Sequence, residues 1–283
     1  MSLPPDPLPE QIGSVPPPPA SPENQFDVPV QVPVAPGKRA FPAWSGWDVL
    51  AVLVFTTVVI FVFTLAALFI ARTFPAYAHA SITELAMNAR VVIGAQAAAY
   101  PVILLFIFLL VRSKSAKSFG DAIRWKWPGL TAPAYIAGGI VLAIAVQALA
   151  KYLPIPKSLP MDAYFQDATS AYLMAIFGVT LAPLLEEIFF RGLLYPLLGR
   201  AFGVIVGVLL TALAFAAIHG AQLGYAWAPV LSIFIVGVVF TVVRVRTNSV
   251  AKSFLMHCGY NLALFVALWI ASDHFRHLEK VTG

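Results

Sequence analysis

Long runs of apolar residues without any charge dominate this chain. Several of them reach about 20 residues, the length that an α-helix needs to cross the hydrocarbon core of a bilayer. Only 11% of the 283 residues are charged, whereas a soluble domain carries about 25%. The strands of a membrane barrel would alternate apolar and polar residues. The unbroken runs therefore predict an all-α fold, a polytopic bundle of transmembrane helices.

The runs predict about seven spans. The longest stretch without Asp, Glu, Lys or Arg has 43 residues, Ala201–Val243, and is too long for one span. It breaks at the glycines that follow His219 and so supplies a fifth and a sixth span. The segment Ile188–Leu198 could form a further embedded helix, which would raise the number to eight. The expected spans lie in Val49–Ala71, Val91–Val111, Trp127–Ala150, Ala168–Leu185, the two halves of Ala201–Val243, and Ser253–Ser272.

Lys and Arg residues gather between the apolar runs. The segment 112–126 carries five of them and the segment 244–252 carries three. With seven spans, both segments fall on one side of the membrane. The positive-inside rule places that side and the N-terminus in the cytoplasm, and the C-terminus outside. The expected location is the cell (cytoplasmic) membrane, and the net charge of +5 does not indicate a nucleic-acid partner.

Composition divides the chain into three parts. Residues 1–43 form an expected disordered tail, since residues 1–40 hold 12 of the 23 prolines and no apolar signal sequence. Residues 44–272 form the expected transmembrane domain, and residues 273–283 a short polar tail. The single cysteine, Cys258, can make neither an internal disulfide nor a multi-cysteine metal site.

A group of polar residues interrupts the later apolar runs. A charged side chain at the centre of a bilayer costs about 2.5–3.5 kcal/mol on insertion scales, so each of these residues needs a reason to be there. They are Glu186, Glu187, Arg191, His219, His257 and Asn261.

Helical geometry separates the two glutamates. Glu187 and Arg191 are four residues apart and can form an ion pair on one helix face. Glu186 points about 100° away from Glu187 and can face a cavity as a general base. A buried ion-pair network or a transport path would also explain the two acids.

The two histidines and the asparagine can supply hydrogen bonds. His257 and Asn261 share one helix face and could both donate to a developing oxyanion, or they could join two helices as an interhelical pair. His219 follows the fifth span, at its far end, whereas Glu186 and His257 lie toward the opposite side of the membrane. The three meet only if Ile188–Leu198 is an additional embedded helix or the fifth span begins later than Ala201.

Together these residues are the parts needed to activate water and stabilise a tetrahedral intermediate. The sequence lacks a zincin-type His-Glu-x-x-His helix and a Gly-x-Ser-x-Gly elbow. With its motifs in this order, the sequence resembles the CAAX protease and bacteriocin-processing (CPBP) family, also called Abi or type II CAAX prenyl endopeptidase-like proteins. The resemblance spans roughly residues 168–265 and rests on three motifs. The first is a Glu-Glu pair followed by Arg, here Glu186, Glu187 and Arg191. The second is a Phe four residues before a His, here Phe215 and His219, and the third is a His four residues before an Asn, here His257 and Asn261.

The resemblance implies an intramembrane endopeptidase, with residues 44–272 as a transmembrane protease domain. Glu186 matches the water-activating glutamate of the family, and His219 its partner in holding that water. His257 and Asn261 match the oxyanion-binding pair, and Glu187 and Arg191 match supporting positions. The expected partners are the lipid bilayer and a peptide or membrane-anchored protein substrate.

The role of a metal is left open by the sequence. The family is often labelled a metalloprotease, and a glutamate-and-histidine mechanism without metal is also proposed for it. Zinc held by Glu186, His219 and His257 would occupy the glutamate that is otherwise the base, which favours no metal. Glu187 could then take over as base, so zinc remains an alternative.

Two functions of other classes remain beside the protease. A non-catalytic membrane scaffold or immunity protein could use the same fold to bind a partner. A proton-coupled transporter could use Glu186, Glu187 and the histidines as a relay. Such transporters often show inverted repeats, and none is evident in this sequence.

Overall fold

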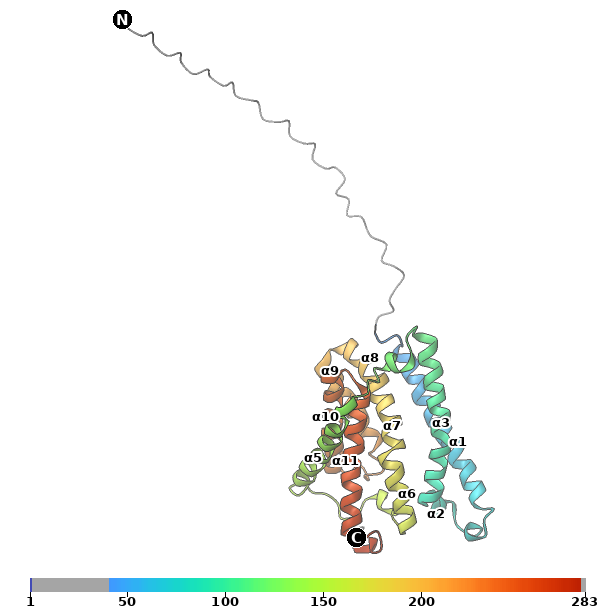
Figure 1. The fold of residues 1–283 in the computed structure, drawn as a ribbon. Helices are drawn as coiled ribbons and strands as arrows, with labels where there is room; N and C mark the ends of the chain where they lie inside the picture. Colours follow the sequence, from blue (N-terminus) through green and yellow to red (C-terminus); the bar gives the residue numbers. More distant parts are fainter. Residues whose placement is uncertain (2–40, 281–283) are drawn as a thin grey trace. The chain divides into compact units, whose positions relative to one another are not determined.

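The computed structural model describes Met1 and residues 41–280, and for Lys280 the backbone only. The predicted disordered tail lies outside these residues except for Met1 and residues 41–43. The described part of the chain is all-α, as predicted, and most of its helices run roughly antiparallel to their neighbours (Figure 1). The α-helices are α1 (Gly46–Ala71), α2 (Ile82–Ala86), α3 (Ala89–Lys114), α4 (Phe119–Ile123), α5 (Ala132–Ala150), α6 (Ala168–Val179), α7 (Leu181–Glu187), α8 (Tyr195–Phe202), α9 (Val204–Ile218), α10 (Trp227–Thr247) and α11 (Val250–Ala271).

Shorter elements join these helices. The 3₁₀ turns are η1 (Pro75–Tyr77), η2 (Gly129–Thr131), η3 (Pro160–Tyr164) and η5 (Leu278–Lys280). The remaining element, η4 (Ile188–Leu194), is a π-helix that connects α7 to α8 without a break. Polar side chains cap several of the long helices: Ser45 accepts from the backbone N–H of Asp48 before α1, and Asn88, Asp167 and Ser249 do the same for α3, α6 and α11.

Among the described residues, six helical segments are long and apolar enough to cross a membrane, so the chain is a multi-pass membrane protein. This criterion finds six segments where about seven spans were predicted, because the segment predicted as the fifth span is the 15-residue helix α9. At about 1.5 Å per residue it is about 22 Å long, shorter than a hydrocarbon core of about 30 Å. The six segments are Gly46–Ala71, Ala89–Lys114, Gly129–Ala150, Ala168–Phe202, Trp227–Thr247 and Val250–Ala271.

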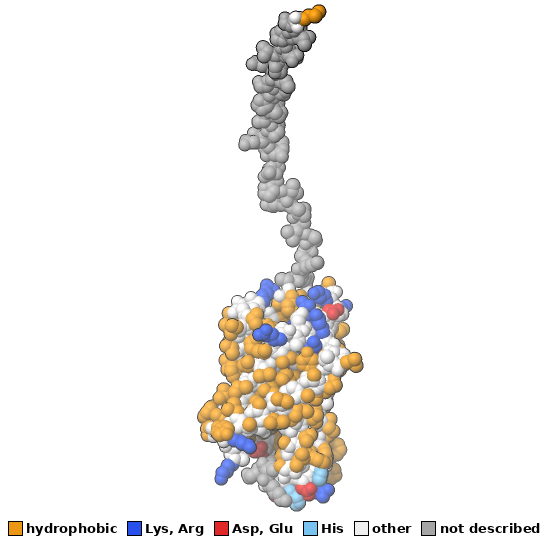
Figure 2. Space-filling model, turned by 60° about the vertical axis from the view of Figure 1, so that its left-hand side comes forward, with side chains coloured by type: hydrophobic (Ala, Val, Ile, Leu, Met, Phe, Trp, Pro, Cys, Tyr) orange, Lys and Arg blue, Asp and Glu red, His pale blue; other side chains and the backbone are white. Residues whose placement is uncertain are grey.

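The outer surface of the bundle is apolar. Large hydrophobic side chains such as Phe61, Phe69 and Val141 are exposed, and Figure 2 shows a broad band of hydrophobic side chains over the visible face. In water so large an apolar surface would be unfavourable. It fits a lipid environment, in which apolar side chains need no burial inside the protein.

One end of the bundle, here called the basic end, gathers the start of α1, the end of α3, α4, the end of α8 and the α10–α11 connection. Lys114 forms an ion pair with Asp48 at 3.0 Å, Arg200 donates to the Pro42 carbonyl at 3.3 Å, and Ser249 donates to the Lys126 carbonyl. Blue side chains gather at this end in Figure 2.

The other end, here called the C-terminal end, gathers the starts of α3 and α6, η3, the α9–α10 connection and the end of α11. Arg90 forms an ion pair with Asp167 at 2.8 Å. The backbone N–H of Met161 donates to the Gln222 carbonyl at 3.1 Å. Beyond α11, Phe275 is buried against Phe165 in a small apolar cluster.

The helices α5 and α11 cross in close contact. A Cβ atom added at Gly259 would overlap the backbone of Ile136, and one added at Gly139 would overlap the backbone of Met256. Small residues let transmembrane helices approach this closely. The crossing fixes the position of α11, which carries His257 and Asn261.

Candidate active site

The two glutamates lie where helix geometry changes. Glu186 and Glu187 are the last residues of α7, and the π-helix follows directly. Short π-helical segments are rare and are frequently found at functional sites. Side chains from other elements bind the backbone here: Trp44 Nε1 donates to the Leu193 carbonyl at 2.9 Å and Arg244 Nε to the Arg191 carbonyl at 3.1 Å. Contacts from the rest of the bundle thus hold the π-helical turn in place.

Glu187 is the centre of a buried polar network. Its Oε1 accepts from Arg191 Nη1 at 2.9 Å, so the predicted ion pair is present, and both side chains are 0% exposed. The same oxygen lies 3.1 Å from His257 Nδ1. A carboxylate stripped of water needs such partners, because an unpaired buried charge is very costly.

Arg191 has further partners on α10. It donates to the Gly237 carbonyl at 3.1 Å and to Thr241 Oγ1 at 3.3 Å. Its guanidinium carbon lies 4.5 Å from the centre of the Phe215 ring, a cation–π distance. Arg191 therefore ties η4 to α9 and α10 and leaves Glu187 little freedom to move.

Glu186 faces the other way, into a cavity of about 410 Å³ that His219, His257 and Asn261 also line. Its Oε1 lies 4.0 Å from His219 Nε2 and its Oε2 lies 3.7 Å from His257 Nε2. These separations exceed a direct hydrogen bond and are suited to a water molecule that bridges the groups. The structure thus brings Glu186 and both histidines together, which is the condition for their acting jointly on one substrate.

The convergence has a simple cause. Gly203, with φ of 82°, makes the sharp turn into α9, so α9 begins at Val204, later than Ala201. Since α9 then runs for only 15 residues from the basic end, His219 stays within the bundle instead of reaching its far end. The expectation that hydropathy places His219 on the opposite side from Glu186 is corrected by this short helix.

Hydrogen bonds determine which nitrogen of His219 carries a proton. Nδ1 lies 2.8 Å from the Phe215 carbonyl, and a carbonyl can only accept, so Nδ1–H is the donor. In the neutral ring Nε2 is then an acceptor. Glu186 and His219 Nε2 present two acceptors to the same region of the cavity, and a water molecule between them would donate to both.

His257 is oriented in the same manner. Its Nδ1 donates to the Glu187 carboxylate, which fixes the ring and directs Nε2 toward Glu186. Nε2 thus faces the cavity beside Glu186, 3.7 Å from its Oε2.

Asn261 lines the cavity, but its amide is partly engaged elsewhere. Nδ2 donates to the Gly178 carbonyl of α6 at 2.7 Å. This is the interhelical bond that the sequence left as an alternative. An amide nitrogen has two hydrogens, so one remains for a ligand in the cavity.

Other polar residues of the cavity were not predicted. Gln96 and Tyr100 lie one turn apart on α3, and Asp162 and Gln222 lie toward the C-terminal end. The spacing of Gln96 and Tyr100 within an apolar run was a signal that could have been read. Asp162 and Gln222 lie in connections between helices, shortly after a proline and a glycine. Helical periodicity does not predict where side chains in such connections lie.

The metal alternative can be compared with this geometry. Among the described residues, no group of three or more His, Cys, Asp or Glu side chains is arranged to hold a metal ion. Glu186, His219 and His257 are therefore not arranged as a zinc-binding site in this structure.

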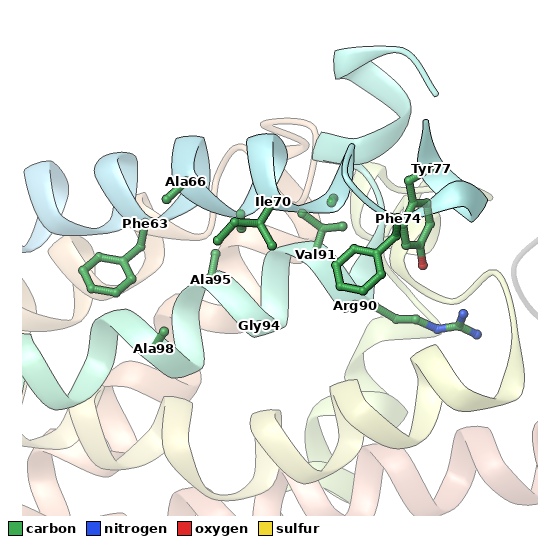
Figure 3. A pocket seen from close by; sticks show the side chains of 12 residues that line it. Phe63, Ala66, Ile70, Phe74, Tyr77, Arg90, Val91, Gly94, Ala95 and Ala98 are labelled. Carbon is green, nitrogen blue, oxygen red and sulfur yellow. The ribbon is translucent and has the colours of Figure 1, made fainter. Parts of the chain in front are cut away.

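A second cavity, of about 440 Å³, lies between α1 and α3 (Figure 3). Its walls are apolar, with Phe63, Ile70 and Ala95 among them, and Arg90 lies toward one end. None of the predicted site residues lines it. The candidate active site is thus the cavity around Glu186.

Comparison with known proteins gives one match. Residues 168–263 match the family described as Rce1-like, type II CAAX prenyl endopeptidase Rce1-like, so this part of the chain is an Rce1-like CPBP family domain. The matched residues run from α6 into α11 and include all six predicted site residues. The comparison with curated proteins and the comparison with solved structures found no match.

Proposed function

We propose, starting from the Rce1-like domain of residues 168–263, that this chain is an intramembrane endopeptidase that hydrolyses a peptide bond of a membrane-associated protein or peptide. The observation that carries the proposal is the position of Glu186. Its two carboxylate oxygens face one imidazole nitrogen each, at 3.7 and 4.0 Å, in a cavity within the bundle. This arrangement suits a water molecule that acts as the nucleophile.

Glu186 is the proposed general base. Water bound between its carboxylate and His219 Nε2 donates both hydrogens to these acceptors and keeps its lone pairs free for the scissile carbonyl. As the oxygen attacks the carbonyl carbon, Glu186 takes the proton and later gives it to the leaving amine. The Phe215 carbonyl holds the His219 ring in the orientation that this step needs.

His257 and Asn261 are the proposed oxyanion donors. His257, whose ring Glu187 holds through Nδ1, offers Nε2–H to the oxyanion in this proposal. Asn261 offers the amide hydrogen that is not bound to Gly178. Donors fixed by other bonds need little reorganisation as charge develops in the transition state.

Glu187 and Arg191 are proposed positioning residues. Both side chains are fully buried, so they hold His257 rather than touch the substrate. The cavity walls include Phe177, Ile233 and Leu264, which suit an apolar segment of a polypeptide or a lipid-anchored protein.

The proposal is tested with purified protein in lipid nanodiscs and a library of quenched fluorogenic peptides that contain apolar segments. Wild-type protein should cleave a subset of the library, and Glu186→Gln should reduce turnover at least about 10²-fold, the lower end of what a positioned base supplies. Glu279→Gln, the same chemical change outside the cavity, is the matched control and should keep wild-type turnover. Equal cleavage by wild type and Glu186→Gln would contradict the proposal. So would a wild type that cleaves no peptide above background, which is the result that a scaffold protein would give.

A further inference from the structure

The cavity around Glu186 extends toward the C-terminal end of the bundle. Met161, Asp162, Gln222 and Leu268 line its outer part, and all four belong to segments that meet at that end. Gln222 is exposed and Asp162 half-buried. None of the lining residues comes from the described segments of the basic end, 112–128, 199–203 and 244–252.

A layer of buried charged and polar side chains separates the cavity from the basic end. Arg191 and Thr241 are 0% exposed and Arg244 is 2% exposed. Arg244 reaches Asn248 at the end of α10 through a 3.1 Å hydrogen bond. These residues fill the space between Glu187 and the α10–α11 connection, so access from the basic end is blocked.

The two ends differ strongly in charge. The connections at the basic end carry nine Lys and Arg residues and two acids, Asp48 and Asp121. The segments that join the helices at the C-terminal end, 72–90, 151–167 and 272–280, carry six Lys and Arg residues and five acids. The nine basic residues are Arg112, Lys114, Lys117, Arg124, Lys126, Arg200, Arg244, Arg246 and Lys252.

We propose that the basic end faces the cytoplasm, that the cavity therefore opens on the non-cytoplasmic side, and that the substrate is a polypeptide segment presented from that side. The positive-inside rule gives the orientation, and the cavity gives the side of access. The statement about substrate rests on the proposed function, whereas the statement about access does not.

This orientation selects a class of substrate. A secreted or outward-facing membrane-anchored polypeptide can reach Gln222 and Asp162 at the mouth and extend its apolar part into the cavity. A lipid-modified protein confined to the cytoplasm would meet the closed basic end. The proposed substrate is thus a translocated polypeptide with an apolar segment next to the cleaved bond.

Cysteine labelling in intact cells tests the side of access. In a Cys258→Ala background, which removes the one native cysteine, Gln222→Cys reports on the mouth and Lys117→Cys on the basic end. A membrane-impermeant maleimide should label Gln222→Cys in intact cells and Lys117→Cys only after permeabilisation. Ala221→Cys, an exposed neighbour in the same connection, replaces Gln222→Cys if that variant is not produced.

The reverse labelling pattern would overturn the proposal, and so would equal labelling of both positions in intact cells. Labelling needs no turnover, so it is also carried out in Glu186→Gln, where the same pattern is expected. A second measurement adds an impermeant fluorogenic peptide to right-side-out and inside-out vesicles. Cleavage mainly in right-side-out vesicles supports the proposal, and cleavage mainly in inside-out vesicles overturns it while leaving the hydrolase intact.

Discussion

At the scale of single residues, the site divides the work between two adjacent glutamates. Glu187 is sealed in a network with Arg191 and His257, whereas Glu186 faces the cavity and both imidazole rings. A change of about 100° per residue along a helix produces this division. We therefore expect substitution of Glu186 to reduce turnover and substitution of Glu187 to reduce the stability of the fold.

The first prediction concerns Asn261, which both lines the cavity and joins α11 to α6. Asn261→Ala should lower turnover about 10²–10³-fold with little change in apparent substrate affinity, because an oxyanion donor is lost. It should also cost about 0.5–1.5 kcal/mol of stability through the lost bond to Gly178. Asn261→Asp should be worse for turnover, since a carboxylate repels the developing charge. Turnover and thermal unfolding are measured on the same samples, and a purely structural role is indicated if stability falls while turnover of the folded fraction does not.

The second prediction concerns the buried ion pair. Arg191→Ala should destabilise the protein by about 3–5 kcal/mol, because it leaves the Glu187 carboxylate buried without its cation. The double variant Glu187→Gln with Arg191→Met removes both charges and should recover part of that loss. Thermal unfolding in a single detergent compares the wild type, Arg191→Ala and the double variant. A double variant less stable than Arg191→Ala would show that the network is held by contacts other than the charge pair.

At the scale of elements, two features bring the site together. The π-helix η4 continues α7 into α8, and its carbonyls bind Trp44 and Arg244. The short helix α9 ends at the depth of Glu186 because it begins after Gly203 and runs for 15 residues. The close crossing of α5 and α11 then sets the position of His257 and Asn261.

The third prediction tests that crossing. Gly259→Ala should lower the unfolding temperature markedly, because the added Cβ would overlap the backbone of Ile136 on α5. The matched control is Gly94→Ala on α3, where an added Cβ meets nothing within 4 Å. That variant should be neutral or more stable by about 0.5–1 kcal/mol, since alanine favours a helix interior. Similar unfolding temperatures for the two variants would mean that the helices can separate at no cost.

At the scale of the whole molecule, the described bundle has a basic end and a C-terminal end toward which the candidate active-site cavity extends. The six candidate membrane-spanning segments of the described residues enclose, together with α9, polar groups that would be unfavourable in lipid. Glu186, His219, His257 and Asn261 line one cavity within the Rce1-like domain. The segments before residue 168 contribute walls to that cavity, including Gln96 and Tyr100.

The fourth prediction concerns metal dependence of the assembled protein. We expect the purified, active protein to contain well below one equivalent of zinc and to keep its activity after extensive chelation, because in the proposed mechanism Glu186 and His219 hold the water directly. Elemental analysis and peptide cleavage before and after chelation give the measurement. One equivalent of zinc, with activity lost on chelation and restored by zinc alone, would assign Glu186, His219 and His257 as ligands.

The sequence by itself determined the all-α membrane class, the position of most spans, the Glu187–Arg191 pair and the family of residues 168–263. These depend on local properties: apolar runs of a given length, helical spacing, and motifs that lie in order along the chain. It could not determine that α9 has only 15 residues, or that Glu186 meets His219, because the depth of a residue depends on where a turn begins and on how neighbouring helices pack. The bond from Asn261 to Gly178, the π-helical turn and the direction in which the cavity extends arise from contacts between residues far apart in the chain. Only the tertiary structure decided them, because each depends on which distant residues the packing of the helices brings together.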